Sequence, residues 1–158
     1  MAHCDYSVTL QSNLKTNNSP ESLMEEKTAD LTRNVEFFRR HLNQRLTGKR
    51  DPNDADIPIF FPVIEGSLDS YSKGKTLHIH AALGNLPATL AQEAIEALIL
   101  EIWKSAMCGI SDIQIDPFKD LTAKSKWSSY ILKEIKRGNF EVVDLKNLQG
   151  PQRIVRAK

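Results

Sequence analysis

The chain has 158 residues, of which 41% are hydrophobic and 26% charged, and its formal net charge is +1. These values indicate a globular domain with an ordinary core and exclude a disordered chain or a membrane protein. No apolar run can span a bilayer and the N-terminus lacks a signal-peptide core, so we expect a cytoplasmic protein. Cys4 and Cys108 are too few for a disulfide framework. A balanced charge requires that any nucleic-acid surface be a local basic patch.

The first third of the chain predicts a strand and a long helix. Residues 6–11 alternate apolar and small polar side chains, which is typical of a half-buried strand with Thr9 facing away from the core. The polar residues 12–18 predict a loop. Apolar residues at helical spacing then predict a helix from Pro20 to about residue 47, ended by Gly48.

The middle of the chain predicts a β-hairpin. Residues 57–65 are rich in β-forming residues but contain Pro58 and Pro62. Because proline cannot donate to a strand ladder, we expect this strand at the edge of a sheet. The polar segment 66–75 contains glycine and predicts the hairpin loop. The second strand, residues 76–83, has strictly alternating apolar side chains.

His78 and His80 lie on the other face of this second strand, since side chains alternate along a strand. Their Cα atoms should be roughly 6–7 Å apart, so that the two imidazoles can chelate one divalent ion. The alternative, two histidines that only hydrogen-bond in a half-buried sheet, is commoner for an isolated His-x-His pattern. The hairpin places Glu65 beside the pair, and its carboxylate is the further ligand that favours a metal site.

The second half of the chain predicts two helices and two strands. In chain order they are a helix from about residue 90 to Gly109, a strand over 110–117, a helix over 120–138 and a strand over 140–145. Gln114 and Asp116 point outward from the first of these strands. They are reserve candidates for contact with metal or DNA, although an exposed polar strand face is the better explanation.

The helix over 120–138 carries a tyrosine among cations. At about 100° per residue, Lys126, Lys133 and Arg137 lie close together, with Tyr130 between them and the apolar stripe. Such cations attract a phosphate, and a tyrosine hydroxyl is a possible nucleophile. Without the histidines, an ordinary amphipathic helix with a tyrosine at its boundary explains the same pattern.

Together these residues resemble the HUH endonucleases, whose name describes two histidines flanking a bulky hydrophobic residue. The resemblance rests on His78-Ile79-His80, the preceding Glu65 and the motif Tyr130-Ile131-Leu132-Lys133. The Y-x-x-K pattern is similar to that of single-tyrosine, Rep-type rolling-circle replication initiators. Pro62, inside the ligand-bearing strand, departs from the family pattern.

The resemblance spans residues 6 to about 145 and implies an α+β fold. It implies a single domain with a central antiparallel sheet and helices packed mainly on one face, a ferredoxin- or RRM-like arrangement. We therefore expect an endonuclease domain over residues 1–148 and a basic C-terminal tail over residues 149–158.

The chemistry that the resemblance implies is metal-dependent, site-specific nicking and rejoining of single-stranded DNA or an origin hairpin. Glu65, His78 and His80 would hold Mn²⁺ or Mg²⁺, and mixed nitrogen and oxygen ligands suit Mn²⁺ better. Tyr130 would form a covalent 5′-phosphotyrosine that starts rolling-circle replication, while Lys133 stabilises the developing charge. The sequence contains no G-x-x-x-x-G-K-[ST] motif, so strand separation would need a separate helicase.

Four alternatives have their own signatures. A single-tyrosine HUH transposase typically has glutamine as a further metal ligand four residues after the tyrosine. This chain has Glu134 there, and since a glutamate can also bind metal, this alternative stays open. A relaxase usually has a third histidine in its motif, which is missing here. A cupin site needs a glutamate shortly after the second histidine, and residues 81–85 contain none. The last alternative is a nucleic-acid-binding module without catalysis, against which the intact tyrosine, lysine and ligand set argue.

Overall fold

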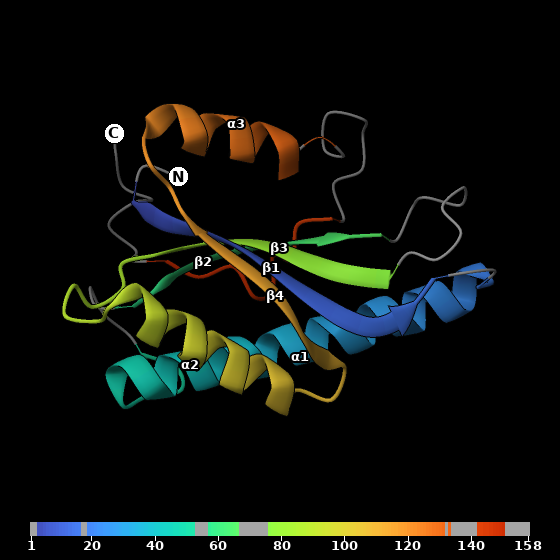
Figure 1. The fold of residues 1–158 in the computed structure, drawn as a ribbon. Coiled ribbons are helices and arrows are strands. Elements are labelled where there is room, and N and C mark those ends of the chain that lie inside the picture. Colours follow the sequence, from blue (N-terminus) through green and yellow to red (C-terminus); the bar gives the residue numbers. More distant parts are fainter. Residues whose placement is uncertain are drawn as a thin grey trace, which may run out of the picture.

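The computed structural model describes residues 3–16, 19–52, 57–66, 76–131, 133 and 142–150. Its elements in chain order are β1 (Cys4–Lys15), α1 (Glu21–Thr47), β2 (Ile59–Glu65), β3 (Thr76–Gly84), α2 (Gln92–Ser105), β4 (Gly109–Pro117) and α3 (Leu121–Ile131). The strands form one antiparallel sheet in the order β2-β3-β1-β4 (Figure 1). The expected α+β fold with a central antiparallel sheet is therefore confirmed.

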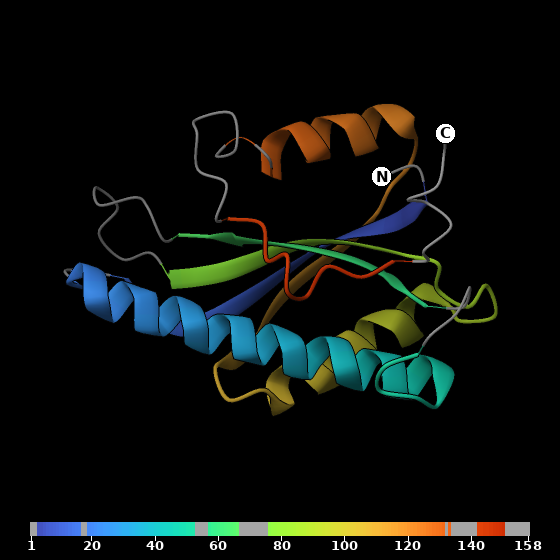
Figure 2. The ribbon, with the colours of Figure 1, turned by 180° about the vertical axis from the view of Figure 1, so that it is seen from behind.

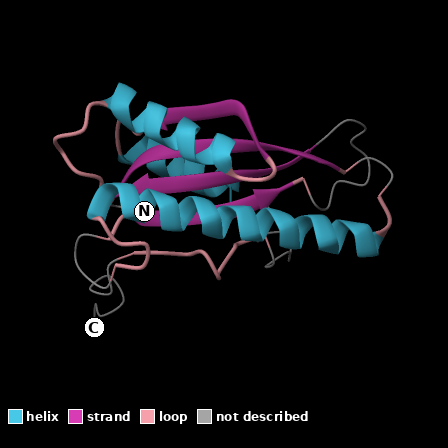
Figure 3. Cartoon of the chain, turned by 90° about the horizontal axis from the view of Figure 1, so that it is seen from below, coloured by secondary structure: helices cyan, strands magenta, loops and turns pink. Residues whose placement is uncertain are grey.

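Two helices cover one face of the sheet and the third lies over the other. Figures 1 and 2 show α1 and α2 below the strands and α3 above them, and Figure 3 shows α1 and α2 from below. The main core lies between the sheet and the helix pair, where Phe38, Ile79 and Trp103 are fully buried. Trp103 also donates a hydrogen bond of 2.7 Å to the Gln11 carbonyl, which fixes α2 to β1.

The alternation predicted for β3 is present in the structure. Its core-facing side chains are all completely buried: Leu77, Ile79, Ala81 and Leu83. His78 and His80 are only partly buried and face the side of the sheet on which α3 lies. The burial of this apolar face fixes the position of the strand and so of the two histidines on its other face.

A second, smaller apolar cluster holds α3 over the outer face of the sheet. Val63 of β2 and Val142 are buried there, and Trp127 of α3 packs against them. The rings of Trp127 and Phe118 also meet edge to face, with 5.5 Å between their centroids. Because Glu65 follows Val63 on the same face of β2, this cluster brings α3 close to the carboxylate.

The position of β2 at a sheet edge, expected from its prolines, is confirmed. The backbone amides of Phe60 and Ile64 turn away from β3 and donate to carbonyls in residues 142–150, at 2.9 and 2.7 Å. Pro62 lies between them on the same side, where its carbonyl accepts from the Asp144 amide at 3.2 Å. The missing amide of Pro62 therefore breaks no bond to β3, and Glu65 keeps its place in the hairpin.

The first strand is longer than its sequence predicts. Residues 12–15 were expected in a loop, but β1 continues to Lys15 with an irregular register after Gln11. Ser12 is buried, and its hydroxyl donates to the Leu77 carbonyl at 2.5 Å and accepts from the Leu14 amide at 3.1 Å. A polar side chain is stable here because it replaces ladder bonds that the irregular register disrupts.

The predicted end of the second helix is also wrong. Helix α2 ends at Ser105, and Gly109 is the first residue of β4. A Cβ atom on Gly109 would lie only 1.9 Å from the Trp103 carbonyl oxygen. Glycine is therefore needed here for close backbone approach and not as a helix cap.

The C-terminal part of the described chain follows the edge of β2 without forming a regular strand. Residues 142–150 make isolated bridges there, between Val63 and Val143 and between Phe60 and Gln149. The rest of the strand expected over 140–145 lies outside the described residues, as do the hairpin loop after Gly66 and most of the helix beyond Ile131.

Within the expected tail, the Gln149 side chain exchanges two hydrogen bonds of 2.8 Å with Asn43 of α1. The packed chain therefore reaches at least this residue.

Among the helices that the structure describes, none combines the length and apolar character needed to cross a membrane.

Candidate active site

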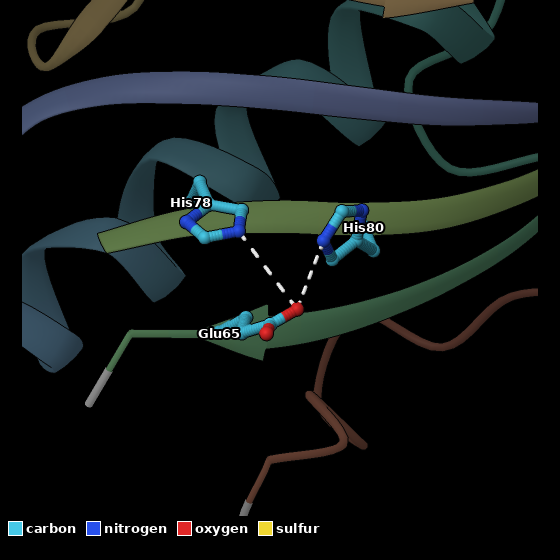
Figure 4. A group of neighbouring side chains, drawn as sticks. All are labelled: Glu65, His78 and His80. Atoms are coloured by element: carbon cyan, nitrogen blue, oxygen red, sulfur yellow. Dashed lines mark ion pairs between the residues drawn. The ribbon is translucent and has the colours of Figure 1, made fainter. Parts of the chain in front are cut away.

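One carboxylate and two imidazoles converge on the outer face of the sheet. Glu65 at the end of β2 pairs with His78 across the ladder, and His80 lies one full pleat further along β3. The Oε2 atom of Glu65 is 2.9 Å from His80 Nε2 and 3.8 Å from His78 Nε2 (Figure 4). Each side chain keeps some exposure, between 12% and 22%, so solvent and ligands can still reach the group.

The donor set fits a divalent ion. One ligand atom from each of the three residues lies within 4.8 Å of the other two. Imidazole nitrogens and carboxylate oxygens bind such ions at about 2 Å, so donors of one ion are about 3–4 Å apart. Small side-chain adjustments would therefore close the group around a single ion.

The protonation states that the fold imposes also suit a cation. The hydrogen bond from His80, with a further one from Lys133, lowers the pKa of Glu65 to about 2, although burial opposes this. Burial lowers the pKa of His78 despite the acceptor that the Thr76 carbonyl offers it. An ionised carboxylate and a neutral imidazole are the forms that bind metal.

Helix α3 brings the tyrosine to this group. The Tyr130 ring stands edge to face with His80, with 5.7 Å between the ring centroids. Lys133 Nζ lies 4.1 Å from the centre of the Tyr130 ring and 2.5 Å from Glu65 Oε1. Burial disfavours its charge, but the bonds to Glu65 and Tyr130 outweigh this and raise the pKa of Lys133. Tyr130 itself is half exposed, so a substrate can reach part of its side chain.

All five residues singled out from the sequence therefore meet at one place, and the reserve candidates do not join them. Gln114 and Asp116 are exposed on β4, which β1 separates from β3, and they hydrogen-bond to each other at 2.7 Å. Within the described ranges, neither belongs to a group that could hold a metal. Glu134 and Arg137 lie outside the described residues.

Sequence reasoning did not single out Thr9, which contacts His80 in the structure. This residue pairs with His80 across the β1–β3 ladder, and its Oγ1 lies 3.0 Å from His80 Nδ1. The signal was present, since Thr9 was expected to face away from the core. Only the pairing of β1 with β3, which no local pattern specifies, places it beside the histidine.

The charge of Glu65 leads to a prediction about stability. We expect the contribution of this carboxylate to the unfolding free energy of the metal-free protein to be lost as the pH falls from about 4.5 to about 2. The folded-state pKa is the lower one, so the unfolded chain binds more protons in this window and stability rises with pH across it.

Urea unfolding of the wild type and of Glu65→Gln measures this contribution. The difference in unfolding free energy between the two proteins should be largest above pH 4.5 and shrink towards pH 2. A difference that stays constant over this range would contradict the assigned charge state.

Comparison with known proteins assigns the chain to no family. No protein-family model matches the chain, and a search of curated proteins found no significant match.

Proposed function

We propose that this protein nicks and rejoins single-stranded DNA at a specific site through a covalent 5′-phosphotyrosine, and that it thereby initiates rolling-circle replication. The observation that carries the proposal is that a tyrosine and a lysine meet a group of three candidate metal ligands from other elements. This ligand group consists of Glu65, His78 and His80. Tyr130 and Lys133 reach the outer face of the sheet from above, and the ligand group lies beneath them on β2 and β3.

Each side chain has a role in this reaction that its position supports. Glu65, His78 and His80 would hold Mn²⁺ or Mg²⁺, which when bound supplies a Lewis acid that polarises and orients the scissile phosphate. The Tyr130 oxygen attacks phosphorus, so that a bond from phosphorus to the phenol oxygen forms while the bond to the 3′-oxygen breaks. The phenol loses its proton to solvent, and the departing 3′-oxygen takes one up.

The products explain how the strand is rejoined. One phosphodiester replaces another, so the energy of the broken bond is kept in the phosphotyrosine. A free 3′-OH can attack this intermediate and reseal the strand without ATP. The substrate must be single-stranded or locally melted, because the phosphate has to enter between α3 and the sheet, and we expect a separate helicase as partner.

A covalent-capture assay tests the proposal. The protein is incubated with Mn²⁺ and a library of labelled single-stranded oligonucleotides, and products are separated under denaturing conditions. A protein–DNA band that carries the new 5′ end, maps to Tyr130 and is released by an excess of strand with a free 3′-OH is the expected result. Mn²⁺ binding without any adduct across the library would instead favour the non-catalytic binding module.

Lys133 should affect the rate without being essential. Its ammonium is shared between Glu65 and Tyr130, where it can stabilise the phenol oxygen or the charge that develops on the phosphate. Removing one such electrostatic contact costs on the order of 3 kcal/mol, or about a hundredfold in rate. We therefore expect Lys133→Met to slow single-turnover cleavage by about this factor.

Lys126→Met is the matched control, since it removes the same charge from an exposed position on α3. It should have the milder effect. Equal single-turnover rates for Lys133→Met and the wild type would mean that Lys133 plays no part in the reaction.

A further inference from the structure

The two imidazoles of the ligand group differ in the group that their Nδ1 atom contacts. His78 Nδ1 lies 3.1 Å from the backbone carbonyl oxygen of Thr76. A carbonyl only accepts hydrogen bonds, so the proton of this imidazole is on Nδ1. The Nε2 atom of His78 then carries a free lone pair on the side of Glu65, in the form that a metal ligand needs.

His80 is held in the opposite form. Its Nε2 lies 2.9 Å from Glu65 Oε2, and an ionised carboxylate also only accepts, so the proton of His80 is on Nε2. In the neutral imidazole, Nδ1 then carries no proton and accepts a hydrogen bond, and the group 3.0 Å away is the Thr9 hydroxyl. As a metal ligand through Nε2, His80 needs the other tautomer, in which Nδ1 carries the proton and donates it.

We propose that Thr9 is the positioning residue that allows His80 to exchange these two tautomers when a metal ion binds. A hydroxyl can donate to Nδ1 in the metal-free protein and accept from Nδ1–H once Nε2 is a ligand. A backbone carbonyl, as at His78, supports only the second form. Thr9 therefore stabilises His80 in both states without moving the ring. This proposal rests on the metal role of His80 in the proposed function.

The arrangement of the strands makes Thr9 suitable for this role. Thr9 and His80 are direct partners in the β1–β3 ladder, so the two side chains stand side by side on the outer face. The hydrogen bond between them is partly buried, which limits competition from water. Ser7 stands on the same face of β1, but its hydroxyl donates to the Asp116 carbonyl and not to the metal group.

Metal titration tests the proposal without DNA. Mn²⁺ affinity is measured by calorimetry for the wild type, Thr9→Ser, Thr9→Val and Ser7→Ala. Valine keeps the shape and suits a strand but cannot hydrogen-bond, so Thr9→Val should bind Mn²⁺ about 10–100-fold more weakly. Thr9→Ser and Ser7→Ala should stay close to the wild type. Equal affinities of Thr9→Val and the wild type, or equal losses for the serine and valine variants, would overturn the proposal.

Nitrogen-15 NMR of the histidine rings gives a second reading on the wild type alone. At about pH 8, where a free imidazole is neutral, His80 should carry its proton on Nε2 without metal and on Nδ1 with Zn²⁺. His78 should carry its proton on Nδ1 in both states. An unchanged His80 tautomer with Zn²⁺ bound would refute the exchange. Neither readout needs cleavage, so a failure to nick DNA leaves this inference standing, whereas a wild type that binds no metal refutes both.

Discussion

Replacing Tyr130 by phenylalanine is expected to abolish covalent adduct formation and to lower DNA cleavage by on the order of 10⁴-fold or more. The substitution removes the attacking oxygen and almost no volume. The ring contact with His80 and the apolar packing of α3 through Trp127 do not involve the hydroxyl. The loss should therefore appear in the chemical step and not in the fold.

In this variant, binding of single-stranded DNA should persist although its cleavage is lost. Fluorescence anisotropy with a labelled single strand should give Tyr130→Phe nearly the affinity of the wild type, because the cations of α3 and the ligand group are untouched. Tyr6→Phe is the control, since Tyr6 packs against the main core beneath the sheet. It should keep full activity. Undiminished cleavage by Tyr130→Phe, or an adduct on Tyr6 or Tyr71, would exclude Tyr130 as the nucleophile.

The ligand group could be predicted from the sequence because it depends on local rules. The two-residue period of a strand placed His78 and His80 on one face, opposite four apolar side chains that the structure buries. A hairpin makes the end of one strand the neighbour of the start of the next, and Glu65 pairs with His78 in the ladder. These relations span few residues and need no knowledge of the remaining fold.

The features that could not be predicted depend on contacts between distant segments. Ser12 looked like the start of a loop, yet its hydroxyl bonds to the Leu77 carbonyl of a strand far along the chain. Gly109 looked like a helix cap, but it is glycine because the Trp103 carbonyl approaches its Cα closely. The position of Thr9 beside His80 likewise follows from the strand order, which local periodicity does not determine.

The placement of α3 over the ligand group also depends on contacts between distant segments. The helix and its tyrosine were predicted, but the face of the sheet on which α3 lies was not. That choice follows from the outer apolar cluster, in which Val63 and Val142 are buried beneath Trp127. Val142 comes from a segment far along the chain that contacts the free edge of β2, and this cluster brings Tyr130 to the histidines.

Removing both imidazoles should eliminate metal binding and activity together. We expect the double variant His78→Ala, His80→Ala to show no saturable Mn²⁺ binding by calorimetry and no cleavage, and a chelator to inactivate the wild type. Each single variant, and Glu65→Gln, should bind Mn²⁺ more than about 100-fold more weakly, since a lost ligand costs more than the loss of its hydrogen-bond partner. All three side chains lie on the outer face and outside the main core, so the variants should remain folded.

His41→Ala provides the matched control for the loss of an imidazole. His41 is on α1, which covers the other face of the sheet (Figure 1). Its ring hydrogen-bonds to the Phe37 carbonyl and lies against the Phe37 ring. Its removal should leave Mn²⁺ affinity and cleavage unchanged, with circular dichroism and thermal unfolding confirming the fold of every variant. Cleavage at the wild-type rate by the double variant, in the presence of chelator, would exclude a metal role for the histidines. Tyr130 would then have to act with the Lys133 ammonium as its only positive partner in the part of the site that the structure describes.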